Sequence, residues 1–278
     1  MEKFQSKYTI KKLYNDTYAI TDNGFGQVNV YMYLLVGTKK ALLVDSGYGL
    51  LDLKSIIRTV TDLDVICCCT HGHVDHALGA HQFEEAYLHS NDFDVYKHHS
   101  SPDFINDMAT KGLLMRPSKK MLNSPGYQYL AEKMAKKDYP TLKALDDVPC
   151  FDLGERVVTW FHAAGHTQGS VVFVDEKYGT VFDGDASAFG AWLFLPESGS
   201  LPDYQTMLKN YLAFMEERGI TRRYVGHSGK PLNNKWLRRM IRCVEVADSK
   251  PKKGIKISTL FGDARIVFAG GSLLFCRK

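Results

Sequence analysis

The sequence has no long hydrophobic run. Its longest apolar stretches, such as Val65–Cys69 and Val171–Val174, have the length of a strand. They fall far short of the roughly 20 residues that a membrane-spanning helix needs. The first residues, Met1–Lys12, carry charges and lack the apolar segment followed by small residues that marks a secretory signal. We therefore expect a protein without a membrane anchor, located in the cytoplasm.

The cysteine pattern of a disulfide-stabilised domain is also missing. The six cysteines form one run, Cys67–Cys69, and three isolated residues, Cys150, Cys243 and Cys276. This spacing favours reduced thiols. On a strand, the side chains of the run would point alternately to opposite faces and could not converge on one ion. We expect them to be small buried apolar residues.

No internal repeat or low-complexity tract divides the chain of 278 residues, of which 45% are hydrophobic and 24% charged. This length and composition predict a single catalytic domain over residues 1–278. Periodicity and turn residues predict helices at 51–60, 202–217 and 234–246 and strands at 17–20, 28–36, 41–44, 65–69, 156–161, 171–174, 180–182, 223–225, 255–258, 264–268 and 273–275.

The segment Asn91–Asp147 has a different character. It contains four methionines and helical spacing without runs of β-branched residues, which predicts an inserted helical lid. Because methionine suits adaptable apolar surfaces, such a lid could line a substrate pocket, form the surface of a homodimer or only pack on the core. These alternatives remain open.

Positive charge is concentrated toward the end of the chain, although the net charge is only +4. The segment either contacts an anionic substrate or partner or forms a solvated basic helix and loop. Its basic residues are Arg222, Arg223, Lys230, Lys235, Arg238, Arg239, Arg242, Lys250, Lys252, Lys253 and Lys256.

The most informative motif is the turn Thr70–His76, directly after the predicted strand 65–69. It places four candidate metal ligands, His71, His73, Asp75 and His76, within six residues. Imidazoles and a carboxylate on such a turn can point at two neighbouring positions. With only 10 histidines in the chain, a chance cluster of this kind is rare.

Three further candidates each follow a glycine just after a predicted strand. They are His166 after Gly165, Asp185 after Gly184, and His227 after Gly226. Taken singly, each could be an ordinary turn. Together they are typical of ligands presented on tight turns at one edge of a sheet, and they complete a site for two metal ions.

In these motifs the chain resembles the metallo-β-lactamase-fold hydrolases, which carry a His-x-His-x-Asp-His turn, a Gly-His-Thr-x-Gly-Ser turn, a Gly-Asp turn and a final Gly-His. The resemblance extends from about Val28 to Ser228, outside the lid. It implies an α/β protein with an αββα sandwich and its site at one edge of the sheets. The strand-end Asp45 would support the site without binding metal.

The same resemblance implies how the ligands are divided. His71, His73 and His166 would hold one ion, Asp75, His76 and His227 would hold the other, and Asp185 would bridge the two. Two divalent ions are expected, with zinc first because imidazole and carboxylate ligands suit it, although iron and manganese accept the same ligands.

Two departures from the family pattern bear on the activity. Ala164 and Gln168 stand where many relatives have proline, which affects loop stiffness alone. Asp185, in place of a cysteine or serine, resembles the glyoxalase II and general hydrolase branches and not the enzymes that cleave β-lactams. We do not expect antibiotic hydrolysis, and no residues that would grip glutathione are recognisable.

The resulting hypothesis is a metal-dependent hydrolase in which a metal-bridging hydroxide cleaves a small-molecule ester, thioester or lactone. Asp75 would orient the hydroxide and later protonate the leaving group. A phosphodiesterase or nuclease is an alternative, but the basic residues are not interleaved with aromatic ones as nucleic-acid binding would favour. An iron-dependent oxidoreductase and an inactive metal-binding protein are weaker alternatives.

Overall fold

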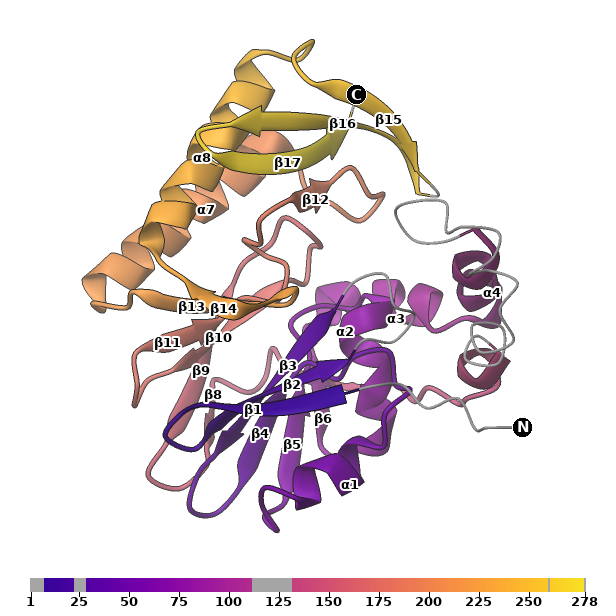
Figure 1. Ribbon diagram of the computed structural model, residues 1–278, viewed down its shortest axis with the longest axis vertical. Helices are drawn as coiled ribbons and strands as arrows, with labels where there is room; N and C mark the ends of the chain where they lie inside the picture. The colour runs from indigo at the N-terminus through magenta and orange to yellow at the C-terminus, as the bar shows by residue number, and fades with distance from the viewer. Residues whose placement is uncertain (1–7, 23–28, 112–131, 260, 278) are drawn as a thin grey trace.

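The computed structural model describes residues 8–22, 29–111, 132–259 and 261–277, and within these ranges the chain forms a mixed α/β structure with three sheets (Figure 1). The first sheet has its strands in sequence order. They are β1 (Tyr8–Tyr14), β2 (Thr17–Asp22), β3 (Val30–Val36), β4 (Ala41–Val44), β5 (Val65–Cys68), β6 (Ala86–Leu88) and β7 (Lys143–Ala144). The pairs from β1 to β4 are antiparallel, and those from β4 to β7 are parallel.

The second sheet has the order β14-β13-β11-β10-β9-β8 and the third the order β12-β17-β16-β15. The strands of the second sheet are β8 (Cys150–Asp152), β9 (Val157–His162), β10 (Val171–Asp175), β11 (Thr180–Phe182), β13 (Arg222–Val225) and β14 (Ser228–Leu232). Those of the third are β12 (Ala191–Leu193), β15 (Ile255–Thr259), β16 (Gly262–Ala269) and β17 (Ser272–Arg277).

The helices lie between and outside these sheets. They are α1 (Leu53–Arg58), α2 (Val74–Ala77), α3 (Phe93–His99), α4 (Pro102–Lys111), α7 (Leu201–Glu217) and α8 (Asn234–Ser249), with the short 3-10 helices η1 (Leu78–Gln82) and η2 (Ser90–Asp92). Helix α7 begins at the cap residue Ser200, whose hydroxyl accepts the backbone N–H of Asp203. As the periodicity predicts, it buries Tyr204, Leu208 and Tyr211.

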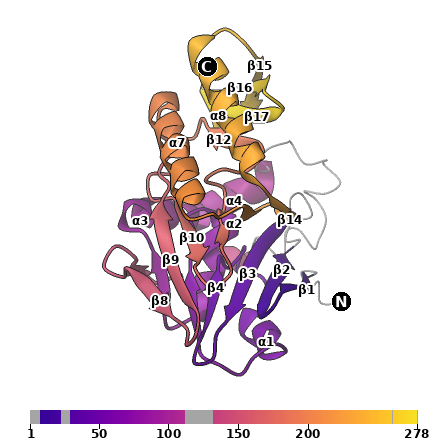
Figure 2. The ribbon, with the colours of Figure 1, turned by 90° about the vertical axis from the view of Figure 1, so that its left-hand side faces the viewer.

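Three hydrophobic clusters define an αββα sandwich. Leu35 of the first sheet and Phe173 of the second meet in the central cluster, so the two sheets pack face to face. The other face of the first sheet packs against α1 to α4, and the other face of the second packs against α7 and α8. Figure 2 shows these layers from the side. The fold predicted from the sequence is confirmed.

The cysteine run behaves as a strand inside this sandwich. Cys67 and Cys69 lie in the outer cluster of the first sheet, whereas Cys68 lies in the central cluster. All three are free and fully buried. The alternation expected for a strand covered on both faces is therefore confirmed.

Several short strands have no counterpart in the predictions. β6, β8, β12 and β14 contain three to five residues each, too few for an alternating pattern to stand out. Tertiary pairing forms them: β12, for example, pairs with β17, about 80 residues later in the chain.

The expected lid over 91–147 is only partly described, because residues 112–131 lie outside the described ranges. Its first part forms α3 and α4. Near its end, β7 pairs with β6 and so extends the first sheet. The lid and the single-domain boundaries remain predictions. Among the described residues, no helix combines the length and apolarity needed to cross a membrane.

The basic segment requires one correction. The sequence predicts that Arg223, like its basic neighbours, either contacts an anionic group outside the chain or is solvated, but it is fully buried. Its guanidinium donates to Asp183 Oδ2 from Nε at 2.9 Å and from Nη2 at 2.7 Å. Adjacent residues of a strand point to opposite faces, so β13 directs Arg222 to solvent and Arg223 into the interior.

Candidate metal centre

The structure brings all seven predicted ligands together where several strands end. The turn Thr70–His73 follows β5, and His73 is the cap residue of α2, which carries Asp75 and His76. His166 follows β9, Asp185 follows β11, and His227 lies between β13 and β14. Their potential ligand atoms fall into groups of three that lie within 4.8 Å of one another.

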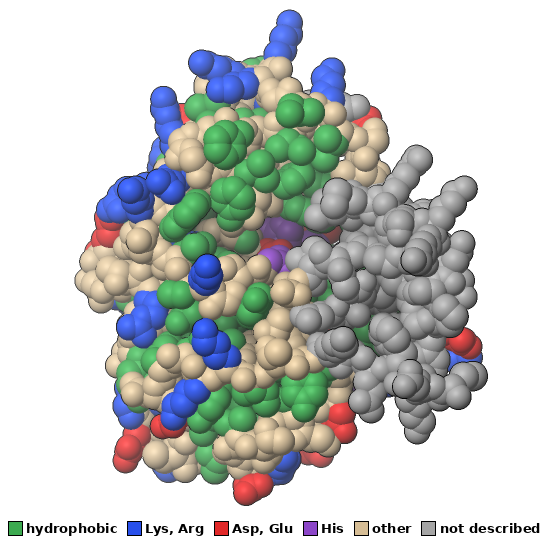
Figure 3. Space-filling view, viewed as in Figure 1, with side chains coloured by type: hydrophobic (Ala, Val, Ile, Leu, Met, Phe, Trp, Pro, Cys, Tyr) green, Lys and Arg blue, Asp and Glu red, His purple; other side chains and the backbone are tan. Residues whose placement is uncertain are grey.

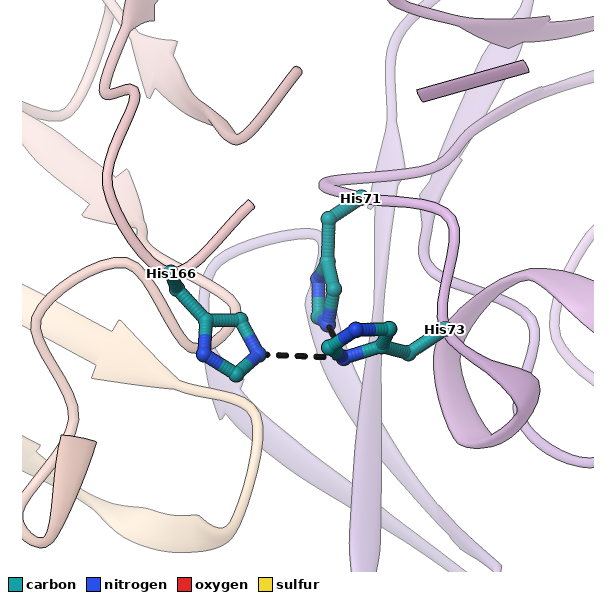
Figure 4. A group of neighbouring side chains, drawn as sticks. All are labelled: His71, His73 and His166. Atoms are coloured by element: carbon teal, nitrogen blue, oxygen red, sulfur yellow. Dashed lines mark hydrogen bonds between the residues drawn. The ribbon is translucent and has the colours of Figure 1, made fainter. Parts of the chain in front are cut away.

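The first group consists of His71, His73 and His166. His71 Nε2 and His166 Nε2 each lie 3.1 Å from His73 Nδ1. Figure 4 shows the three rings turned toward one another from two separate turns. Nitrogens on one tetrahedral zinc ion, at about 2.0–2.1 Å from it, are separated by roughly 3.3 Å. The spacing fits three nitrogens that converge on one ion.

The second group joins Asp75, His76 and His227 with Asp185, which itself forms a group of three with His71 and His76. His76 Nε2 lies 3.7 Å from both Asp75 Oδ2 and Asp185 Oδ1. His227 Nε2 lies 3.1 Å from Asp185 Oδ2 and 3.5 Å from Asp75 Oδ2. Asp185 Oδ2 is also 3.9 Å from His166 Nε2 of the first group. Asp185 therefore stands between the two groups.

The outer nitrogen of each ligand histidine is held by the protein. This arrangement fixes the orientation of each ring and leaves its other nitrogen directed into the cluster. The partners are Thr70 Oγ1 for His71 Nδ1 (3.0 Å), Glu197 Oε1 for His73 Nε2 (2.8 Å), Asp45 Oδ2 for His76 Nδ1 (2.8 Å), Trp192 O for His166 Nδ1 (2.9 Å) and Asn29 O for His227 Nδ1 (3.0 Å).

Asp45 supports the site from behind, as the resemblance implies. Its Oδ1 accepts the backbone N–H of Thr70 at 2.7 Å, and its Oδ2 lies 3.0 Å from Thr70 Oγ1 and 2.8 Å from His76 Nδ1. The residue is buried and has φ of 61°, a left-handed conformation that aspartate tolerates better than most residues. Asp45 thus ties the start of the ligand turn to its end.

Two buried polar atoms in the cluster have no hydrogen-bond partner: His76 Nε2 and Asp185 Oδ1. They face each other at 3.7 Å, too far for a hydrogen bond. Buried polar atoms are seldom left unpaired, so this pair indicates a missing positive partner. Imidazole nitrogens with carboxylate oxygens are a donor set that suits a divalent ion such as zinc. The residues present fit such an ion.

For His71 and His166 of the first group, the surroundings favour neutral imidazoles. Burial lowers the pKa of His71 well below its ordinary value, and the neighbouring histidines add to the effect. Burial also lowers the pKa of His166 to about 4, with a further contribution from His73. Neutral rings retain the lone pair that a metal ligand needs.

In the second group, the carboxylates reverse this effect. Burial opposes the charged form of His76, but Asp75, Asp45 and Asp185 together raise its pKa to about 10. Burial likewise opposes the charge on His227, and Asp185 raises its pKa to about 9. Without metal, protons take the place that a cation would occupy among these carboxylates, so metal binding releases them.

Steric crowding explains why glycine precedes Asp185 and His227. A Cβ on Gly226 would lie 2.4 Å from His76 Cε1 and 2.8 Å from Asp185 Oδ1. Gly184 has φ of 52°, and its Cβ would lie 2.1 Å from Thr70 Oγ1. These loops can therefore approach the cluster closely only because they lack side chains at these positions.

Asp92 is a supporting residue that the sequence reading missed. It is fully buried, and its Oδ2 accepts the backbone N–H of Gly72 at 2.8 Å and the hydroxyl of Thr167 at 2.6 Å. Its Oδ1 accepts the backbone N–H of Gly169 at 2.7 Å. One carboxylate thereby joins the turn of His71 to the turn of His166. A lone aspartate outside any motif carried no signal of this role.

Replacement of Asp92 by asparagine is expected to weaken metal binding by the first group on the order of 10- to 100-fold, because an amide group would face a backbone N–H that now donates to a carboxylate oxygen. Titration with a competing chelator measures this affinity. The control is Asp94→Asn, since Asp94 is exposed on α3. Equal affinities in the two variants would contradict the role given to Asp92.

His99 and Glu197 lie beside His73 and were also not predicted as site residues. Together with His73 they form a further group of potential metal ligands. A neutral imidazole offers one lone pair, so His73 cannot bind a metal through Nδ1 and another through Nε2. The 2.8 Å contact between His73 Nε2 and Glu197 assigns Glu197 to orienting that ring. His99 stacks on His73 at 4.6 Å, and its Nδ1 accepts the backbone N–H of Val74.

The other histidines lie away from the cluster. His162, which is four residues before His166, contacts Gln168 O and stacks on His89 at 4.4 Å. His81 contacts Leu78 O. These contacts indicate structural roles for His162 and His81.

A cavity of about 260 Å³ opens directly over the cluster. Ligands of both groups form one side of it, and the other sides are mostly aromatic and aliphatic. In Figure 3, histidine side chains are visible at the bottom of a hollow below a gathering of hydrophobic side chains. Among the described residues that line the cavity, none is lysine or arginine.

The family assignment follows from this fold and site. The family model of the metallo-beta-lactamase superfamily matches residues 23–227. The chain belongs to this superfamily and is one of its hydrolases, a class whose fold implies divalent metal ions, typically zinc.

Individual relatives are distant. The chain is 23% identical over 206 residues to the acyl-coenzyme A thioesterase MBLAC2 of Gallus gallus, a match that covers 70% of this chain and 71% of that protein. It is also 23% identical over 209 residues to the protein of the same name from Homo sapiens, covering 70% of this chain and 72% of that protein.

Solved structures show the same fold at low identity. A metallo-beta-lactamase from Pontibacter korlensis aligns with a TM-score of 0.59 and 15% identity, covering 84% of this chain and 97% of that one. DIM-1 metallo-beta-lactamase aligns with a TM-score of 0.59 and 17% identity, covering 87% and 98%. These likenesses concern the fold alone.

Proposed function

We propose that this protein is a binuclear metal-dependent hydrolase that cleaves a small-molecule ester or thioester. His71, His73 and His166 would hold one divalent ion, and Asp75, His76 and His227 the other, with Asp185 shared between them. Zinc is the first choice because the ligands are imidazoles and carboxylates, although iron and manganese accept the same set.

Bound ions of this kind make a hydroxide nucleophile available near neutral pH and polarise a scissile carbonyl. The protein's own contribution is to fix the ligands and to place Asp75 at the cavity. Asp75 lines the cavity and is partly exposed, unlike the fully buried His76. A carboxylate there can accept a proton from the attacking water and deliver it to the leaving group.

The observation that carries the choice of substrate is the cavity wall. An apolar wall directly beside the cluster, with no lysine or arginine among the described lining residues, suits an uncharged acyl group better than a phosphodiester. The distant likeness to acyl-coenzyme A thioesterases supports the same reaction class. Lactones, which contain the same carbonyl chemistry, stay within the proposal.

Metal content provides the direct test. Protein purified without chelator is expected to contain about two zinc or manganese ions per chain, and His73→Ala is expected to lose at least one of them, because His73 Nδ1 lies 3.1 Å from both neighbouring ligand nitrogens. Elemental mass spectrometry measures both. The control is His98→Ala, since His98 is exposed and lies outside the groups of potential ligands.

Hydrolysis is then assayed with p-nitrophenyl esters, acyl thioesters, lactones and bis-p-nitrophenyl phosphate. Cleavage of carbonyl substrates by metal-loaded protein is expected, with little cleavage of the phosphodiester. A preference for the phosphodiester would favour the alternative of a phosphodiesterase or nuclease. Iron in the protein would favour an oxidoreductase. Absence of metal from the wild-type protein would contradict the proposal.

A further inference from the structure

The third sheet is largely separate from the part of the chain that defines the family. Strands β15, β16 and β17 all follow residue 227, where the family match ends. They join β12, which lies inside the match, through the parallel pairing of β12 with β17. Figure 1 shows this sheet at the opposite end of the molecule from α1. The residues after the family match thus add a wall of their own.

The two faces of this sheet have different environments. Leu274 and Cys276 of β17 are fully buried against the cluster that contains α7 and α8. Leu273 and Phe275 alternate with them and therefore point to the other face. Both line the cavity, and Trp192, the register partner of Phe275, lines it beside them. One face of the sheet belongs to the core, and the other covers the metal-ligand cluster.

The cavity face carries apolar side chains that no protein group covers completely. Leu273, Phe275 and Trp192 are each partly exposed, and Phe189, which also lines the cavity, is 54% exposed. Apolar surface kept open beside a polar cluster is typical of a binding site for an apolar ligand group. Because this apolar surface lies beside the metal-ligand cluster, an acyl chain bound to it would place its own carbonyl next to the cluster.

The volume limits the size of that group. A water molecule, which is close to a methylene group in size, occupies about 30 Å³ in the liquid. A cavity of about 260 Å³, one side of which is formed by the metal-ligand cluster, has room for an apolar chain of limited length. This volume is slightly below the roughly 300–1,000 Å³ of pockets for drug-sized ligands.

We propose that the cavity face of the third sheet is an acyl-binding wall that selects uncharged, apolar acyl groups, with Leu273 and Phe275 limiting their length. This inference rests on the proposed ester or thioester hydrolysis. It adds the substrate class and assigns its selection to residues beyond the family match.

The test is a series of acyl thioesters and p-nitrophenyl esters with 2 to 14 acyl carbons, assayed as kcat/KM with wild-type protein and Phe275→Ala. For the wild type, kcat/KM is expected to rise about 4-fold per methylene and to stop rising at a limiting chain length within the series. Removal of the ring should extend the rise by about three carbons. Phe275→Leu serves as a milder variant, and circular dichroism checks that each variant is folded.

The matched control is Phe268→Ala. Phe268 lies in the same sheet, on β16, but is 62% exposed and does not line the cavity. Its replacement is expected to leave the chain-length profile unchanged. An unchanged profile in folded Phe275→Ala and Phe275→Leu, or an equal shift in Phe268→Ala, would overturn the acyl-binding wall.

Calorimetric binding of free carboxylic acids of the same lengths provides a readout besides activity. Affinity is expected to rise with chain length in the wild type and to reach its limit at longer chains in Phe275→Ala. If metal-loaded protein hydrolyses no substrate of the series, the proposed function fails. The binding measurements then still test the acyl-binding wall. If affinity does not depend on chain length, the wall is rejected. If the chain length at which affinity stops rising is greater in Phe275→Ala than in the wild type, the wall is supported.

Discussion

Replacement of Asp75 by asparagine is expected to lower kcat by about 10²- to 10⁴-fold while KM changes little, because proton transfer by a positioned carboxylate contributes on this scale. Asp75 Oδ2 lies 3.7 Å from His76 Nε2 and 3.5 Å from His227 Nε2. It therefore stands within the second ligand group while also lining the cavity. Asparagine keeps the size of the side chain and removes its basicity.

The measurement must separate proton transfer from loss of metal, since Asp75 is also a candidate ligand. Steady-state kinetics are therefore recorded at metal concentrations that saturate the variant, with metal content determined on the same samples. Asp103→Asn is the control, because Asp103 is exposed on α4. A fully metal-loaded Asp75→Asn protein with the wild-type kcat would refute the assigned role.

The second large effect concerns stability: Arg223→Met is expected to lower the free energy of unfolding by about 3–5 kcal/mol. Arg223 and Asp183 are both fully buried, and the guanidinium donates twice to Asp183 Oδ2. Asp183 Oδ1 also accepts the hydroxyl of Tyr211 at 2.6 Å. Methionine fills similar space but leaves a buried carboxylate without its counter-charge.

Denaturant unfolding of metal-free protein measures this cost, since bound metal would add its own stabilisation. The matched control is Arg222→Met on the adjacent, exposed position, where a change below about 1 kcal/mol is expected. In the double variant Arg223→Met, Asp183→Asn the loss should be smaller by at least about 1 kcal/mol than the sum of the single losses. Additive losses would show that the two side chains do not act as a pair.

The same pair connects the core with the candidate site. Asp183 is two residues before Asp185, and the backbone N–H of Asp183 donates to Tyr224 O at 2.8 Å. The buried pair thus fixes the loop that presents Asp185 between the two ligand groups. The partner of Asp183, Arg223, lies in the basic segment that was expected to contact an anion or to be solvated.

Most residues of the candidate site could be predicted from the sequence, because they lie in short motifs that directly follow strands. His71 and His73 lie in one turn, and the glycine before His227 recurs before His166 and Asp185. Such motifs are local in sequence, so they are visible before folding. The structure brings these residues together, while their function as ligands remains a prediction that metal analysis tests.

The residues that support the site were not readable in this way. Asp92 and Glu197 are single acidic residues without a motif, and they acquire a role only through contacts with segments far away in the chain. Glu197 meets His73 across 124 residues, and Asp92 meets Gly169 across 77. Nothing in the local composition distinguishes them from exposed carboxylates.

The sequence by itself determined the longer helices, most of the longer strands and the candidate ligands, because these depend on periodicity and on turns of a few residues. The tertiary structure alone decided that Arg223 is buried and that the strands after residue 227 form a wall over the cluster. These features depend on pairings between distant segments, such as β12 with β17, whose free energy comes from packing and not from local preference.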